Sequence, residues 1–139
     1  MDSGGLNNIT YRINGCAMKV HNALGNGFQE VIYQRCLAIE LKKEGLAFVR
    51  EQEHPIYYDG IKVGTRRADL VVADRVVVEL KALIHLEDVH LAQAKNYVTA
   101  YRKPVGLLIN FGAKSLQFKK IYNPACHPEN PDPARERNH

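Results

Sequence analysis

The chain has 139 residues and a formal net charge of +4, and its hydrophobic (45%) and charged (24%) fractions are those of an ordinary globular domain. No apolar run approaches the roughly 20 residues of a membrane-spanning helix, and no apolar leader opens the chain, so we expect a cytoplasmic protein without membrane contact. Three cysteines without Cys-x-x-Cys spacing exclude a disulfide framework and a zinc ribbon, and they indicate a reducing compartment.

Two helical patterns come first. Apolar residues recur at three- and four-residue spacing from Ile13 to Leu24 and again from Ile32 to Leu41. The sequence Gly25-Asn26-Gly27 separates the two patterns, and Gly45 ends the second one directly beyond its basic last turn.

Segments rich in β-formers follow the helices. One strand is expected from Phe48 to Tyr58, and after a hairpin turn at Asp59-Gly60 a second strand runs to about Val72. The polar break Ala73–Arg75 separates it from a third strand, which runs from Val76 to about Ala82.

The last elements are a helix and two strands. The helix is expected from Glu87 to Tyr101, because Pro104 cannot continue it, and the strands from Val105 to Asn110 and from Leu116 to Tyr122. The resulting order, ααβββαββ, predicts an α/β domain built around a mixed sheet.

The C-terminal end differs in composition from the rest. Residues 123–139 hold four of the six prolines and no apolar side chain larger than cysteine, so burial there cannot offset the entropy of ordering. We therefore expect a folded domain over residues 1–122 and a flexible proline-rich tail over residues 123–139.

Two of the expected strands place carboxylates face to face. Glu79 and Lys81 share one face of the third strand, because strand side chains alternate. If Ala73–Arg75 is a three-residue hairpin loop, Asp69 lies opposite Glu79, with Cβ atoms roughly 5 Å apart. Carboxylates at that distance repel each other unless a cation lies between them. The pattern predicts either an ion pair on a solvated face or a site for a hard divalent cation such as Mg²⁺.

The same register places Arg67 opposite Lys81. Two like charges side by side are favourable only when they share an anion such as phosphate or a carboxylate. Arg67 is therefore the main candidate for phosphate binding, whereas Arg66 points to the other face and is expected to be solvated.

Asp69 followed by Glu79-x-Lys81 resembles the signature of the PD-(D/E)XK nuclease superfamily, although Ala68 stands where that signature has proline. The resemblance implies a restriction-endonuclease-like fold, in which a mixed central sheet flanked by helices forms an αβββαβ core. Gly27-Phe28-Gln29-Glu30-Val31-Ile32-Tyr33 further resembles the motif of the GxxExxY family within that superfamily.

The resemblance implies metal-dependent hydrolysis of phosphodiester bonds in nucleic acid, DNA rather than RNA. Asp69 and Glu79 would hold Mg²⁺ or Mn²⁺ together with the backbone carbonyl of Leu80. Lys81 would orient the attacking water or stabilise the transition state. Glu30 would be an additional metal carboxylate or would act close to the metal, or else would be a helix N-terminal carboxylate favoured by the macrodipole.

The expected third helix carries Gln93 and Tyr97 four residues apart, a spacing that resembles the helix motif of the superfamily's exonuclease-like branch. Gln93 would bind the attacking water or a phosphate, or would pack against the sheet. Tyr97 and Tyr33 would contact the nucleic acid.

The alternative is a non-catalytic module that binds nucleic acid or another protein on a nuclease-like fold, because a fold does not determine an activity. A homodimer is a further alternative, since a second subunit would enlarge the surface for DNA.

Overall fold

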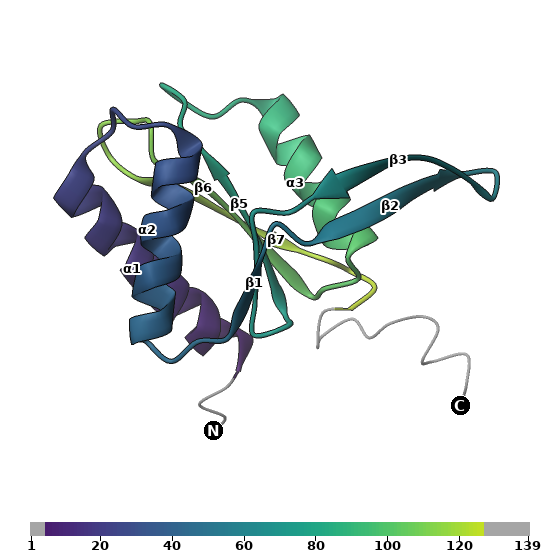
Figure 1. Ribbon diagram of the computed structural model, residues 1–139, viewed down its shortest axis with the longest axis horizontal. Coiled ribbons are helices and arrows are strands. Elements are labelled where there is room, and N and C mark those ends of the chain that lie inside the picture. The colour runs from purple at the N-terminus through teal and green to yellow at the C-terminus, as the bar shows by residue number, and fades with distance from the viewer. Residues whose placement is uncertain (1–4, 127–139) are drawn as a thin grey trace.

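The computed structural model describes residues 5–126 (Figure 1). The described part of the chain forms three helices and seven strands. The helices are α1 (Leu6–Leu24), α2 (Glu30–Lys43) and α3 (Asp88–Ala100). The strands are β1 (Phe48–Arg50), β2 (Glu53–Tyr58), β3 (Ile61–Arg67), β4 (Leu70–Val72), β5 (Val76–Lys81), β6 (Val105–Asn110) and β7 (Gln117–Tyr122).

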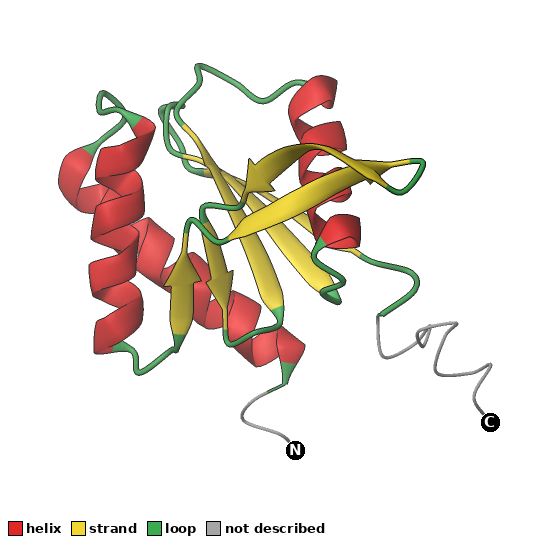
Figure 2. Ribbon diagram, turned by 45° about the vertical axis from the view of Figure 1, so that its right-hand side comes forward, coloured by secondary structure: helices red, strands yellow, loops and turns green. Residues whose placement is uncertain are grey.

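Five of the strands form a mixed central sheet in the order β1-β4-β5-β6-β7. Only β5 and β6 are parallel, and α3 makes the crossover connection that a parallel pair requires. The helices α1 and α2 cover one face and α3 covers the other (Figures 1 and 2). The predicted fold class, a mixed sheet flanked by helices, is confirmed.

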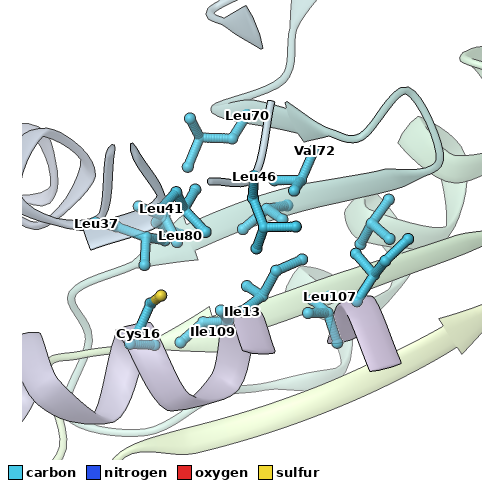
Figure 3. Packing of buried hydrophobic residues seen from close by; sticks show 14 of the residues in the cluster. Ile13, Cys16, Leu37, Leu41, Leu46, Leu70, Val72, Leu80, Leu107 and Ile109 are labelled. Carbon is cyan, nitrogen blue, oxygen red and sulfur yellow. The ribbon is translucent and has the colours of Figure 1, made fainter. Parts of the chain in front are cut away.

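Alternation along the strands divides the buried side chains between two clusters. Leu70, Leu80 and Leu107 belong to the larger cluster, which packs against α1 and α2 through residues such as Ile13 and Leu37 (Figure 3). The smaller cluster lies on the other side and joins residues of the central sheet to α3. Both faces of the central strands are therefore covered, which is why these strands are so rich in valine and leucine.

The expected strand from Phe48 to Tyr58 is wrong as a single element. Glu51 adopts a positive φ of 53°, in the left-handed region, and the chain turns there. The part before the turn is β1, in the central sheet, whereas β2 after it pairs with β3 in a separate two-stranded ribbon. The next expected strand also divides, because Ala68 and Asp69 carry the chain from β3 back into the central sheet as β4.

The two predicted hairpin turns are confirmed. Asp59 and Gly60 both have positive φ, as a two-residue turn between twisted strands favours. Ala73 and Asp74 also have positive φ, at 53° and 55°, and the turn that contains them pairs Val72 with Val76 as predicted.

The folded body continues beyond the expected boundary at Tyr122. Asn123 is 5% exposed, and its backbone N–H donates a hydrogen bond of 3.0 Å to the carbonyl of Pro104. The Cys126 thiol donates to the carbonyl of Arg102. Residues 123–126 therefore belong to the body, and the remainder of the expected tail, residues 127–139, lies outside the described residues. Among residues 5–126, no helix has the length and apolar character needed to cross a membrane.

Candidate functional site

Asp69 and Glu79 lie opposite each other at the point where β4 begins. The antiparallel register pairs Leu70 with Val78, so the next step outward pairs Asp69 with Glu79. The backbone N–H of Asp69 donates a hydrogen bond of 3.1 Å to Glu79 Oε1, and the backbone N–H of Leu80 donates one of 2.8 Å to Asp69 Oδ2. The predicted apposition of the two carboxylates is confirmed.

Burial raises the pKa values of both carboxyl groups, and the charge of Asp69 further raises that of Glu79. Burial, and then the charge of Asp69, raises the pKa of Glu79 to about 9. Burial also raises the pKa of Asp69, although hydrogen bonds from Leu80 and Gln34 oppose that effect. Without a cation, Glu79 therefore carries a proton at neutral pH while Asp69 accepts hydrogen bonds through both oxygens. This donor set fits a hard divalent cation, which would replace that proton.

Gln34 and Arg50 form a contact with Asp69 that sequence reasoning missed. Gln34 is 3% exposed, and its Nε2 donates a hydrogen bond of 3.0 Å to Asp69 Oδ1. Arg50 donates to the Oε1 of the same amide from Nε at 3.1 Å and from Nη2 at 3.0 Å. A usable signal was present in the sequence, because Gln34 follows Glu30 by four residues and so shares its helix face.

Glu30 is the first residue of α2 and reaches the C-terminal end of β5. Its carboxylate accepts a hydrogen bond from the backbone of Ala82. Burial raises its pKa, the charge of Lys81 lowers it, and the charge of Asp69 raises it again. Within residues 5–126, however, no three His, Cys, Asp or Glu side chains lie close enough together to hold a metal ion. Asp69 and Glu79 therefore form a two-carboxylate site, with Glu30 beside it.

Helix α3 contributes two of the predicted side chains. Lys81 donates a hydrogen bond of 3.5 Å from Nζ to Oε1 of Gln93. Tyr97 is half-buried, and burial followed by the charge of Glu79 raises the pKa of its hydroxyl. Arg66, which was expected to be solvated, is half-buried with its guanidinium carbon 5.4 Å from the centre of the Tyr97 ring.

The predicted position of Arg67 is wrong. Arg67 ends β3 and pairs with Glu53 in the two-stranded ribbon, not with Lys81. Its guanidinium forms ion pairs with Glu53 at 3.0 Å and with Glu51 at 3.7 Å. The prediction assumed one continuous strand through Ala68, and the change of sheet at that residue removes Arg67 from the register.

The expectation that Tyr33 contacts nucleic acid is also wrong, because this side chain is 0% exposed. Its hydroxyl donates a hydrogen bond of 2.6 Å to the carbonyl of Gly25 and accepts one of 3.2 Å from the backbone N–H of Phe28. Its ring stacks on Phe111, with centroids 4.6 Å apart. Tyr33 therefore fixes the turn between α1 and α2 that presents Glu30.

Ala68 is held from the α3 side of the sheet, by the residue that follows that helix. The backbone N–H of Ala68 donates a hydrogen bond of 3.1 Å to the Tyr101 hydroxyl, which itself donates to the carbonyl of Gln52. Both views of the whole chain show the β2–β3 ribbon passing in front of α3 (Figures 1 and 2). Because β3 ends at Arg67, two residues before Asp69, the ribbon joins the central sheet beside the carboxylate pair.

Comparison with known proteins identifies the family and the fold of the chain. A family model described as the PD-(D/E)XK nuclease superfamily matches residues 7–121. Among solved structures, the crystal structure of SSO0001 is 21% identical with a TM-score of 0.56, and the match covers 68% of this chain and 50% of that one. This chain therefore spans about half the length of that protein, and a likeness at this identity concerns the fold alone. No curated protein matches the sequence.

Proposed function

The chain belongs to the PD-(D/E)XK nuclease superfamily, and from this premise we propose that it is a metal-dependent nuclease that hydrolyses phosphodiester bonds of DNA. Nucleases of the superfamily generally use divalent metal ions. The observation that carries the proposal is the half-buried pair Asp69 and Glu79, with Lys81 on the same strand as Glu79. The motif from Gly27 to Tyr33 supports placing the chain in the GxxExxY branch of the superfamily.

Asp69 and Glu79 are the proposed ligands of Mg²⁺ or Mn²⁺, and the backbone carbonyl of Leu80 is the proposed third ligand. When bound, a divalent ion polarises a phosphate oxygen and lowers the pKa of a coordinated water. The Asp69 carboxylate is held in place for this role by a donor on each oxygen, Gln34 Nε2 on Oδ1 and the backbone N–H of Leu80 on Oδ2. Glu79 must lose its proton before it can bind the ion.

Lys81 supplies the positive charge nearest to the carboxylates along β5. A side chain two positions along a strand lies about 6–7 Å away on the same face, which is within reach of a phosphate held at the pair. Its contact with Gln93 restrains the ammonium group on the α3 side. We therefore propose that Lys81 stabilises negative charge on the reacting phosphate and that Gln93 orients Lys81 and the attacking water. Tyr97 is proposed to contact the nucleic-acid backbone.

Glu30 is proposed to accept a proton from the attacking water or to bind a water at the metal. Its raised pKa and its position beside Lys81 and Asp69 support a role in proton transfer. The competing role, a carboxylate that only stabilises the N-terminus of α2, requires no partner outside the helix. The hydrogen bond from Ala82 argues against that simpler role.

The direct test is cleavage of linear, circular and single-stranded DNA and of RNA, each with Mg²⁺ and with Mn²⁺. Wild type is expected to cleave DNA, and Glu79→Gln is expected to abolish cleavage while preserving shape. Glu44→Gln is the matched control, because Glu44 caps the far end of α2 and pairs with Arg12. Cleavage that persists in Glu79→Gln, or cleavage of RNA alone, would contradict the proposal.

A second candidate function is a non-catalytic interaction module. It is favoured by the outer end of the β2–β3 ribbon, where Tyr57, Tyr58 and Ile61 are 63%, 76% and 66% exposed. Contiguous exposed apolar side chains mark interaction surfaces. DNA binding without cleavage, measured with metal present, would favour this function; sedimentation velocity would show whether the partner is a second copy of the chain.

A further inference from the structure

We propose that Gln34 and Arg50 act together as a positioning pair that sets the orientation of the Asp69 carboxylate for a divalent cation. The inference rests on the proposed role of Asp69 as a metal ligand. It assigns a task to two residues that the sequence motifs do not include.

The hydrogen bonds allow only one orientation of the Gln34 side-chain amide. Arginine has donors and no acceptor, so the two bonds from Arg50 require an oxygen at the position that they reach. The amide nitrogen must then face the other way, where Asp69 Oδ1 accepts from it at 3.0 Å. Arg50 therefore ensures that the amide nitrogen of Gln34, and not its amide oxygen, faces the Asp69 carboxylate.

The burial of Gln34 keeps water from replacing its two hydrogen-bond partners. The side chain is 3% exposed, so water cannot readily replace a lost partner. Without Arg50 the amide oxygen is left without its charged donor, and the amide can rotate until that oxygen faces Asp69. The carboxylate then loses its donor and turns toward its remaining hydrogen bond from Leu80.

The residue that follows strand β1 holds the same acidic residue through its backbone. Arg50 pairs with Leu70 in the sheet, and the backbone N–H of Glu51 donates a hydrogen bond of 3.0 Å to the carbonyl of Asp69. Glu51, directly after the three-residue strand, thus fixes the main chain of Asp69, and Arg50 at the end of the strand acts on its side chain through Gln34. This explains why a short edge strand ends in an arginine that reaches α2.

The test is a titration of metal-free protein with Mn²⁺ by isothermal calorimetry, using wild type, Gln34→Met, Arg50→Met and the double variant. Loss of a hydrogen-bonding group behind a metal ligand typically weakens affinity by about 10- to 100-fold. We expect each single variant to fall in that range and the double variant to be no weaker than the weaker single variant. Arg50→Lys keeps the charge and one donor, and is expected to recover part of the loss.

Arg12→Met is the matched control, since Arg12 also bonds to a residue at an end of α2, but at Glu44, far from the carboxylate pair. Its Mn²⁺ affinity should equal that of wild type. Thermal unfolding without metal separates a lower stability from a weaker site, because a merely structural pair would lower the melting temperature and leave the Mn²⁺ affinity unchanged.

The outcomes distinguish this inference from the proposed function. If wild type binds no Mn²⁺, the metal site and the positioning pair are both wrong. If wild type binds Mn²⁺ and Arg50→Met binds it equally well, the positioning pair is wrong while the metal site stands. Losses that add in the double variant would show that the two residues act separately. Arg50 is exposed, so its variants carry the test even if Gln34→Met does not fold.

Discussion

The backbone N–H of Asp69 donates a hydrogen bond of 3.1 Å to the carboxylate of Glu79, so one acidic residue supports the other through its main chain while opposing it through its side chain. The charge of Asp69 raises the pKa of Glu79 by more than the hydrogen bond from its backbone lowers it. Together with burial, which is the largest cause, that charge raises the pKa of Glu79 to about 9. A structure that tolerates such a pair requires either a proton or a cation between the two groups.

The first prediction concerns the stability of the metal-free protein. The folded state keeps a proton on Glu79 that the unfolded state loses above its ordinary pKa, so the unfolding free energy should fall as pH rises toward about 9. The slope for one group is at most about 1.4 kcal/mol per pH unit. Urea unfolding in EDTA from pH 5 to 9 measures it. Glu79→Gln should flatten the profile and Glu44→Gln should not; parallel profiles for all three proteins would disprove the assignment.

The second prediction concerns protons released on metal binding. Because Glu79 is protonated at neutral pH, binding of Mn²⁺ should release close to one proton, and Mn²⁺ affinity should rise with pH until about 9. Calorimetric titrations in buffers of different ionisation enthalpy measure the number of protons released. A heat of binding that is the same in every buffer would show that Glu79 is already ionised.

The third prediction concerns Gly112, which lies in the turn after β6. A Cβ placed there would come within 2.3 Å of the backbone N of Leu83 and 2.4 Å of the carbonyl carbon of Ala82. Gly112→Ala should therefore displace the segment that follows Lys81 and destabilise the protein by about 1–3 kcal/mol.

Gly15 is the matched position for that substitution. It lies in the interior of α1, and a Cβ added there would meet nothing within 4 Å, so Gly15→Ala should stabilise the protein by about 0.5–1 kcal/mol. Denaturant midpoints of the two variants compare them directly. A Gly112→Ala variant as stable as wild type would mean that the backbone at Gly112 does not pack closely against Ala82 and Leu83.

The fourth prediction separates the two tyrosines of the sequence motifs. Tyr33→Phe removes the hydroxyl that joins Gly25 and Phe28, and should cost about 1–3 kcal/mol of stability without changing DNA affinity. Tyr97→Phe should weaken DNA binding with little effect on stability. Fluorescence anisotropy with labelled DNA, beside chemical unfolding, measures both. A loss of DNA affinity confined to Tyr33→Phe would reverse these roles.

The carboxylate pair was predictable because its causes are local. Strand alternation and a three-residue turn are enough to place Asp69 opposite Glu79, and both depend on about a dozen consecutive residues. The change of sheet at Ala68 was not predictable in this way. A glutamate at Glu51 gives no sign that it will adopt a left-handed conformation, and the strand-forming residues on either side of it read as one strand.

Helical spacing places Gln34 on the same face of α2 as Glu30, but it could not show what that face contacts. The helix docks against the central sheet through Leu37 and Leu41, and only that docking brings Gln34 to Asp69. Tyr33 shows the converse case. Its place in a sequence motif suggested that its hydroxyl contacts nucleic acid, whereas its ring is buried in the core. In both cases the direction in which the helix faces, and not its existence, decided the role of the side chain.

The tight turn between β4 and β5 has a consequence for the order of events during folding. A hairpin with so short a loop can form within microseconds, whereas α2 must close a much longer loop to reach the sheet. Asp69 and Glu79 can therefore meet before Gln34 arrives to hold one of them. The early hairpin therefore holds two carboxylates that repel each other without a hydrogen bond from Gln34. Protons or divalent ions in the surrounding solution would then influence the folding rate of the domain as well as its stability.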